Sequence, residues 1–433
     1  MSEIITLILF ISILAFFVIT EGSILIALLL GLICFIVYAF YKGNTPKLIA
    51  GMVINGVKNA NTILIVFGLI GILTALWRAG GTIPYIIYYS ISFIEPDYFV
   101  LSAFLLCSMV SVLTGTSFGT ASTMGVVCMS IGLALGIDPF YTGGAILSGV
   151  YFGDRCSAMS SSALLVSELT RTDLFVNIKN MIKTSIIPFI LTALIYAYTG
   201  RIDSVDTMIS TESVSMYSEG FNLYWWVSIP AILVIILSIF KIKVKRTMII
   251  SILASIAVCI LAQGLTFMDV FKVSILGFRS DDPSLGAIIN GGGLISMVRS
   301  ATIVGISSSY FGIFRNTELL KEIKRWIQKL SEITTSFFTT LISSILMSAI
   351  SCNQTLSTML TFELNEKLVP DRYKLAIYLE NTAIVIAPLI PWSIAGAFPL
   401  STIGAPTASI LYAVYLYILP LYGLLTQRDK PTT

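Results

Sequence analysis

The sequence has 433 residues, of which 56% are hydrophobic and only 11% are charged, whereas an ordinary soluble domain is about 25% charged. Water therefore cannot be the main solvent of this chain, and a lipid bilayer must be. The formal net charge is +3, with the basic residues in short clusters between apolar segments, so nucleic-acid binding is not expected. Six cysteines, far apart and in no CxxC pair, indicate neither disulfides nor a zinc site.

Apolar segments follow one another along almost the whole chain. A crossing helix needs roughly 20 residues, so the shortest segments are predicted to be half-helices or hairpin arms. The first segment has no basic region or AxA-like cleavage site, and we expect a retained span. The segments lie near 4–20, 23–41, 52–77, 83–94, 98–113, 121–136, 140–152, 158–167, 185–199, 223–240, 248–265, 287–312, 334–350, 355–362, 375–388, 392–403 and 407–425.

Charge placement predicts a topology with both termini in the cytoplasm. The stretch 201–222, rich in acidic residues, would then face outward, and the amphipathic stretch 316–329 would lie along the cytoplasmic interface or form a solvated connector. The basic residues are Lys42, Lys47, Lys58, Lys241, Lys243, Lys245, Arg246, Arg428 and Lys430, and the outward acidic residues are Asp203, Asp206, Glu212 and Glu219.

A polar interruption of an apolar stretch occurs twice. In the first half TGTSFGT (114–120) follows an apolar arm, and 237 residues later SCNQTLS (351–357) follows another. Each is succeeded by a second interruption, at 153–162 and at 387–392. This order predicts a duplicated unit of a hairpin and a broken helix.

We therefore expect an all-α polytopic membrane protein with about 11 to 13 membrane elements and two structural repeats, inverted about an axis in the membrane plane. Each repeat would hold a re-entrant hairpin, near 98–134 and 334–362, and a discontinuous helix, near 140–167 and 375–403. The chain would divide into an N-terminal half with the first repeat (1–200), an outward loop, span and basic cytoplasmic loop (201–247), and a C-terminal half with the second repeat (248–433).

Interrupted helices at membrane depth predict a binding site. Freed N–H and C=O groups are tolerated there only when they are buried in protein or line a wet cavity. Free carbonyls and Ser, Thr and Asn oxygens can replace the water shell of a small cation, while half-helix N-termini attract anions. The alternative is that these small polar residues mediate ordinary helix packing.

Ionisable residues inside apolar segments are rare and are functional candidates by default. Asp154 and Arg155 lie in the first broken helix, Glu380 lies at the entry to the second, and Arg299 lies in a further apolar stretch and is expected to be structural. The alternatives are a structural clamp for the Asp154 and Arg155 pair and an arginine partner for Glu380. The sequence contains no histidine, so a transported proton would have to travel on a carboxylate.

These residues resemble the NhaC-type sodium/proton antiporter family. The similar stretches are GLIGILTALWRAGGTIP (68–84), TGTSFGT (114–120), AILSGVYFGDRCSAMS (145–160), TRTDLF (170–175), SCNQTLS (351–357) and LENTAIVIAPLIPWSIAGA (379–397). The resemblance implies cation-coupled antiport, with some members exchanging organic or amino acids. It also implies that Asp154, Ser157 and Ser160 belong to the ion or substrate site.

Three acidic residues of the family pattern are absent here, because Ser161, Asn353 and Asn381 stand where aspartates are usual. Carboxylates raise cation affinity and supply a proton acceptor. Their loss favours a neutral or zwitterionic organic substrate over plain Na⁺/H⁺ exchange.

The function we predict is that of a secondary active transporter, not an enzyme, with Na⁺ or H⁺ as the coupling ion and no other cofactor. The alternative is a Na⁺- or H⁺-coupled transporter of an amino acid or small organic acid, whose carboxylate a half-helix N-terminus would receive, alone or with Arg155. The expected location is a prokaryotic plasma membrane, and a homodimer would suit halves that move against a scaffold. The candidate site residues are Thr114, Thr116, Ser117, Thr120, Asp154, Arg155, Ser157, Ser160, Asn353, Gln354, Glu380, Asn381, Thr382 and Pro388, of which Thr116, Ser117, Asp154 and Asn353 are the Na⁺ candidates.

Overall fold

The computed structural model describes residues 2–20, 22–59, 61–91, 95–203, 217–240, 242, 244–282, 285–286, 289–317 and 321–427. Within these ranges the chain is helical and has no β-strand, only an isolated bridge between Phe278 and Gly291. The prediction of an all-α polytopic membrane protein is confirmed. Of the charged residues used to predict the topology, Asp206, Glu212, Lys241, Lys243, Arg428 and Lys430 lie outside the described residues, and the orientation of the termini stays a prediction.

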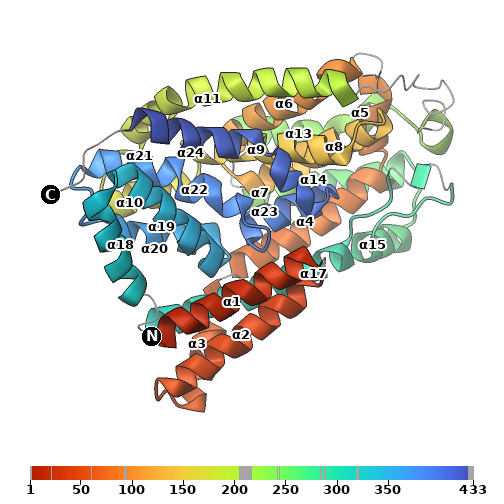
Figure 1. Ribbon diagram of the computed structural model, residues 1–433. Coiled ribbons are helices and arrows are strands. Elements are labelled where there is room, and N and C mark those ends of the chain that lie inside the picture. The colour runs from red at the N-terminus through yellow and green to blue at the C-terminus, as the bar shows by residue number, and fades with distance from the viewer. Residues whose placement is uncertain are drawn as a thin grey trace.

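The helices, in chain order, fall largely on the predicted apolar segments (Figure 1). They are α1 (Ser2–Ile19), α2 (Ile24–Tyr41), α3 (Pro46–Asn59), α4 (Asn61–Ala79), α5 (Thr82–Ile91), η1 (Pro96–Tyr98), α6 (Phe99–Thr114), α7 (Ser117–Thr120), η2 (Ala121–Gly125), α8 (Val126–Ala134), α9 (Pro139–Cys156), α10 (Ser161–Thr170), α11 (Leu174–Asp203), η3 (Trp225–Ser228), α13 (Ile229–Ile239), α14 (Val244–Leu261), α15 (Phe267–Leu276), α17 (Leu294–Asn316), α18 (Lys321–Ile333), α19 (Ser336–Ser351), α20 (Gln354–Asn365), α21 (Arg372–Asn381), α22 (Ala383–Ile386), η4 (Ala387–Leu389), α23 (Ile394–Ile403), η5 (Thr407–Tyr412) and α24 (Val414–Thr426).

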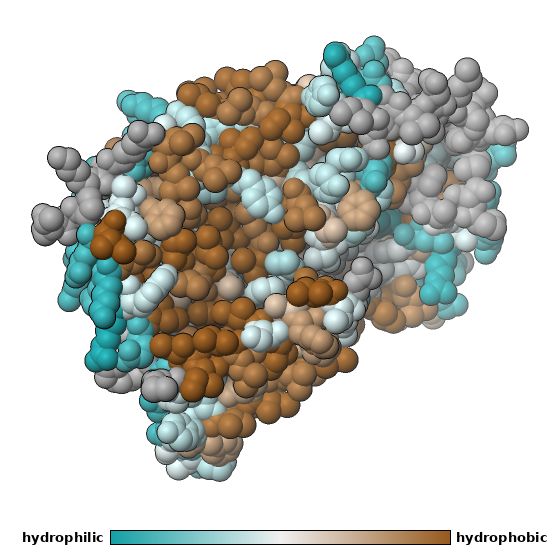
Figure 2. Space-filling view, viewed as in Figure 1, coloured by the Kyte–Doolittle hydropathy of each residue, from teal (hydrophilic) through white to brown (hydrophobic). Residues whose placement is uncertain are grey.

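The outer surface is that of a membrane protein. A broad apolar face separates hydrophilic residues at the left edge of the molecule from those at the upper right (Figure 2). Helix α11, which runs along the top of Figure 1, turns large apolar side chains outward, with Phe175 70% and Leu194 61% exposed. A broad face of such side chains is expected against lipid tails rather than water.

Five of the described helices are long and apolar enough to cross a bilayer alone, or seven if two bent pairs each count as one span. One bent pair joins α4 to α5 at 60°, and the other joins residues 372–389 to α23 at 55°. Helices α10 and α19, with 10 and 16 residues, are too short to cross alone, as predicted for a half-helix and a hairpin arm, whereas the two arms of the first hairpin are among the five long helices. The count of 11 to 13 elements, the three-part division of the chain and the inversion of the halves stay predictions.

The first broken helix differs from its prediction. The interruption was expected at 153–162, but α9 stays helical through Cys156, and only residues 157–160 leave the helix. A Cβ at Gly153 would lie 2.2 Å from the main-chain carbon of Ser111 in α6. Gly153 therefore lets two helices approach closely, which is the packing role that small residues often have in membranes.

Two further features were not predicted. Helix α15 was not among the expected apolar segments. The second broken helix has the predicted break, between η4 and α23, and an additional, unpredicted one at Thr382, where φ is −125° and ψ is −78°. The expected amphipathic helix is present as α18, with Ile327 buried and Trp326 half exposed.

Candidate functional site

The tip of the first hairpin is only two residues long. Helix α6 ends at Thr114, and Gly115 takes a left-handed conformation with φ of 67°. A Cβ at Gly115 would lie 2.5 Å from the main-chain carbon of Met159, so glycine is required there for space as well as for φ. Thr116 is extended, and its side chain accepts a hydrogen bond from the Gly119 amide at 3.4 Å, which begins α7 at Ser117.

The second hairpin repeats this backbone path. Helix α19 ends at Ser351, and Cys352 is left-handed with φ of 54°. Asn353 is extended, with φ of −150° and ψ of 132°, close to the −151° and 126° of Thr116. Its side chain accepts from the Leu356 amide at 3.3 Å, which begins α20 at Gln354. Both predicted interruptions are therefore present, each as a left-handed residue followed by a helix cap.

Asp154 lies where these two tips meet. Its side chain is on the last turn of α9, and the residue is 3% exposed. Oδ1 accepts from the Ser117 amide at 3.4 Å, and Oδ2 accepts from Ser162 Oγ at 3.1 Å and from Gln354 Nε2 at 3.3 Å. We call Asp154, Ser117, Ser162 and Gln354 the Asp154 cluster.

The second broken helix also reaches this cluster. Gln354 Nε2 donates to the carbonyl oxygen of Ile384 in α22 at 3.2 Å, in addition to Asp154. The Tyr151 hydroxyl, one turn before Asp154, donates to the carbonyl oxygen of Ala395 in α23 at 2.7 Å. Two hairpins and two broken helices thus converge on one carboxylate.

All the hydrogen-bond donors to Asp154 are neutral. None of the lysines and arginines in the described part of the chain forms an ion pair with it. A buried carboxylate without a cationic partner is costly, and a proton or a bound cation would offset that cost. Carboxylate, hydroxyl and carbonyl oxygens are suitable ligands for a hard cation such as Na⁺.

Arg155 points away from the Asp154 cluster. Its guanidinium is fully buried and donates to Ser185 Oγ and Asn381 Oδ1, to Thr184 Oγ1 at 2.9 Å and to the Tyr415 hydroxyl at 3.3 Å. These partners lie on α11, α21 and α24. Because the protein already engages this guanidinium, the structure does not place Arg155 to receive a substrate carboxylate.

Glu380 is the second buried carboxyl group. It is 0% exposed, and neither of its oxygens has a hydrogen-bond partner among the described residues. It lies within electrostatic range of Arg155 and Asp154, but no ion pair with Arg155 is formed. Instead the neighbouring Asn381 contacts Arg155.

The other predicted residues lie close to the hairpins and broken helices, where most of their side chains bond to main-chain groups. Ser157 Oγ donates to the Val112 carbonyl at 2.6 Å, and Ser160 caps α10 through the Ser162 and Ala163 amides, each at 3.1 Å. The remaining predicted residues lie within the first hairpin or the second broken helix and make their contacts there. Thr114 and Thr120 bond to each other at 2.8 Å within the first hairpin, Thr382 Oγ1 donates to the Tyr378 carbonyl at 2.6 Å, and Pro388 lies buried in η4.

Two members of the site were not selected from the sequence. Ser162 belongs to a run of serines and could not be told from its neighbours by residue type. Its contact depends on α10 turning back, so that Ser162 Oγ reaches both Oδ2 and the main-chain oxygen of Asp154, the latter at 2.9 Å. The Ile384 carbonyl is a main-chain group, and no side-chain pattern reveals it.

Paired hairpins and broken helices that enclose a buried carboxylate are typical of secondary transporters. A family model described as the Na⁺/H⁺ antiporter family matches residues 149–426, and the chain belongs to this family.

Three relatives show the range of named activities within this similarity. The chain is 31% identical over 384 residues to a Na⁺/H⁺ antiporter, NhaC, of Alkalihalophilus pseudofirmus, covering 86% of this chain and 83% of the relative. It is 29% identical to a malate-2H⁺/Na⁺-lactate antiporter of Bacillus subtilis, covering 86% and 82%. It is 30% identical to the arginine/ornithine antiporter ArcD of Halobacterium salinarum, covering 84% and 77%.

Proposed function

We propose that this protein is a cation-coupled antiporter that binds Na⁺ or H⁺ at the Asp154 cluster. The observation that carries this proposal is the buried Asp154 carboxylate, which has three neutral donors and no cationic partner in the described structure. Asp154 would supply the charge that attracts the cation. Family membership supports ion-coupled transport and leaves the transported solute open.

The donors around Asp154 suggest how binding could be coupled to movement. The Ser162 hydroxyl can rotate to offer a lone pair to a cation, and the Gln354 amide can present either its nitrogen or its oxygen. When a cation arrives, Gln354 and Ser117 would release or reorient, and each belongs to a hairpin tip. Cation occupancy would therefore change how the two tips are held together.

The direct experiment replaces Asp154 with asparagine in proteoliposomes with an imposed pH gradient. We expect Na⁺-dependent dissipation of the gradient in the native protein and its loss, by about a hundredfold or more, in Asp154→Asn. Asp281→Asn is a matched control, because Asp281 is exposed and outside the cluster. Transport by Asp154→Asn at the native rate would contradict the proposed role.

A second candidate function is exchange of a small organic or amino acid for the cation. The names of two relatives, the malate-2H⁺/Na⁺-lactate and the arginine/ornithine antiporter, favour it. So do Ser161, Asn353 and Asn381, which leave fewer carboxylates than plain cation exchange would use. A thermal-shift screen of organic and amino acids with and without Na⁺ separates the candidates, because stabilisation by cations alone would count against this one.

A further inference from the structure

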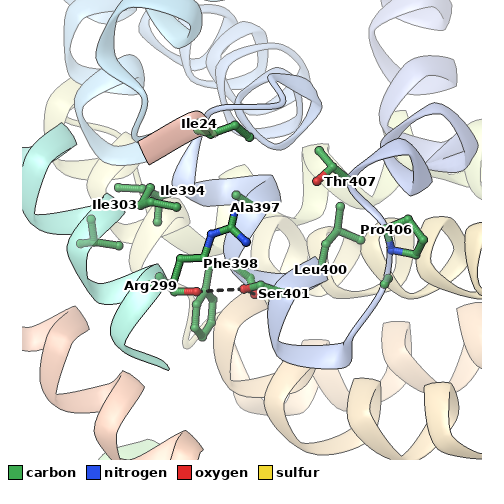
Figure 3. A pocket seen from close by; sticks show the side chains of 13 residues that line it. Ile24, Arg299, Ile303, Ile394, Ala397, Phe398, Leu400, Ser401, Pro406 and Thr407 are labelled. Carbon is green, nitrogen blue, oxygen red and sulfur yellow. Dashed lines mark hydrogen bonds between the residues drawn. The ribbon is translucent and has the colours of Figure 1, made fainter. Parts of the chain in front are cut away.

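A pocket of about 270 Å³ lies beside the second broken helix, between α17 and α23 (Figure 3). The start of α2 and the turn after α23 complete it. The residues that line it are Ile24, Arg299, Ser300, Ile303, Val304, Ile394, Ala397, Phe398, Leu400, Ser401, Ala405, Pro406 and Thr407.

Arg299 is the one charged residue in this lining. Its side chain extends from α17 along the pocket toward Ala397 on α23 (Figure 3). Arg299 is exposed, and no acidic residue in the described part of the chain forms an ion pair with it. Its guanidinium therefore faces the pocket with its donors unused, unlike the guanidinium of Arg155.

The rest of the lining is apolar with a few hydroxyl groups. Ser300 and Ser401 share a hydrogen bond of 3.1 Å that joins α17 to α23, and Thr407 lies across the pocket from Arg299 (Figure 3). An apolar pocket with one charged group and a few hydroxyls suits a small ligand that has an anionic head and a short apolar body.

The pocket ends close to the second hairpin tip. Ile394 lines it, and the Ile394 amide donates to the Cys352 carbonyl at 2.9 Å. Cys352 is two residues before Gln354, which contacts Asp154. A ligand in the pocket would thus press on the helix that supports this tip, yet it would not touch the Asp154 cluster itself.

We propose that this pocket binds a small carboxylate, held by the Arg299 guanidinium. The planar fork of arginine matches a carboxylate with two parallel hydrogen bonds, which makes such pairs stronger than neutral ones. The volume lies just below the range of about 300–1,000 Å³ for pockets of drug-sized ligands, so a small monocarboxylate such as butyrate fits. This site is distinct from the proposed cation site, and its binding of a carboxylate does not depend on Asp154.

The test measures butyrate binding to the full chain in phosphatidylcholine nanodiscs, by thermal shift and calorimetry at constant Na⁺. We expect butyrate to stabilise the native protein and the uncharged butyramide to have no effect. Arg299→Gln should weaken butyrate binding at least about tenfold. Ala397→Leu, which keeps the charge but fills the space beside it, should also weaken binding.

Three further variants make the test decisive. Arg279→Gln is the matched control, because Arg279 is exposed and outside the pocket, and it should bind butyrate as the native protein does. Arg299→Lys should keep part of the affinity, which covers the case in which Arg299→Gln does not fold. Asp154→Asn should keep butyrate binding even if it abolishes transport, so the failure of one proposal is distinguishable from that of the other.

The proposal is overturned by any of three results. The native protein could fail to respond to butyrate, or Arg299→Gln and Ala397→Leu could bind it with native affinity. Alternatively, nanodiscs containing phosphatidylglycerol could stabilise the native protein through Arg299 while butyrate does not, which would assign the guanidinium to a lipid phosphate.

Discussion

Gln354 donates a hydrogen bond to Asp154 across 200 residues of sequence, from Nε2 to Oδ2 at 3.3 Å. The other carboxylate oxygen accepts from the amide of Ser117 at 3.4 Å. Ser117 and Gln354 each begin the helix that follows a hairpin tip, and 237 residues separate them, as they separate Gly115 from Cys352. Equivalent positions of two similar hairpins thus hold the two oxygens of one carboxylate.

Gln354→Ala should weaken cation coupling without removing the charge that attracts the cation. The variant loses one donor to Asp154 and the link to the Ile384 carbonyl, a loss of about 1–2 kcal/mol, which corresponds to roughly a tenfold higher KM for the coupling cation. The measurement is initial transport rate against Na⁺ concentration in proteoliposomes. Gln328→Ala, at an exposed position of α18, is the control, and an unchanged KM in Gln354→Ala would argue against the bridge.

Gly115 and Cys352 should respond differently to substitution although both are left-handed. Gly115→Ala adds a Cβ against the Met159 backbone at 2.5 Å as well as an unfavourable φ, so a clear drop in Tm is expected. Cys352→Gly removes the backbone strain of a left-handed residue that carries a Cβ, but it gains unfolded-state entropy and loses buried surface, and the net change in stability should stay within about 1 kcal/mol. Thermal unfolding in detergent measures both. Equal losses in Tm would show that the space available for a Cβ does not distinguish the two tips.

The sequence predicted the hairpin tips well because their signal is chemical and local. A small or polar residue that ends a helix, followed by Thr116 or Asn353 as a cap, can be recognised without knowing the fold. The role of Arg155 could not be predicted in this way. Its neighbour Asp154 faces the tips, whereas Arg155 faces α11 and α24, and adjacent helical residues differ in direction by about 100°. The direction of the Arg155 side chain depends on partners far along the sequence, such as Thr184 and Tyr415.

The unexpected break at Thr382 has a similar cause. Thr382 lies inside a stretch that is apolar by composition, and residue types alone gave no reason to end a helix there. In the fold, Thr382 Oγ1 donates to the Tyr378 carbonyl one turn earlier, a bond that often bends helices, and the helix is interrupted at Thr382. Likewise Gly153 led us to predict an interruption that begins at residue 153. Residues 153–156 instead stay in α9, where Gly153 packs closely against α6.

Arg155→Leu should destabilise the fold much more than it affects cation binding. It would leave the buried side chains of Asn381 and Ser185, and the half-buried Thr184, without their main donor, a loss of about 3 kcal/mol or more. Arg155→Lys should not restore stability, because one ammonium group cannot reach partners on three helices. The measurement is Tm in detergent, with Na⁺-induced stabilisation as a second readout.

Arg325→Lys is the matched control for Arg155, since Arg325 is exposed and, within the described residues, its ion pair is with Glu322 at 2.7 Å. It should leave Tm unchanged. If Arg155→Lys instead kept the native Tm and lost the response to an organic ligand, Arg155 would be a ligand-binding residue after all.

Glu380→Gln should separate proton movement from cation binding. The glutamate is fully buried with no hydrogen-bond partner for either oxygen in the described structure, so its charge is offset only by the Arg155 guanidinium within electrostatic range, by a proton or by a bound cation. We therefore expect Glu380 to carry a proton, which glutamine cannot release. In proteoliposomes, Na⁺-driven proton efflux should fall by at least about tenfold, and its dependence on pH should flatten. Na⁺-induced thermal stabilisation should persist, because the Asp154 cluster is intact.

Glu366→Gln, at an exposed position paired with Arg372, should change neither readout. Native proton efflux in Glu380→Gln would leave Asp154 as the proton carrier, whereas loss of Na⁺ stabilisation would place Glu380 in the cation site itself.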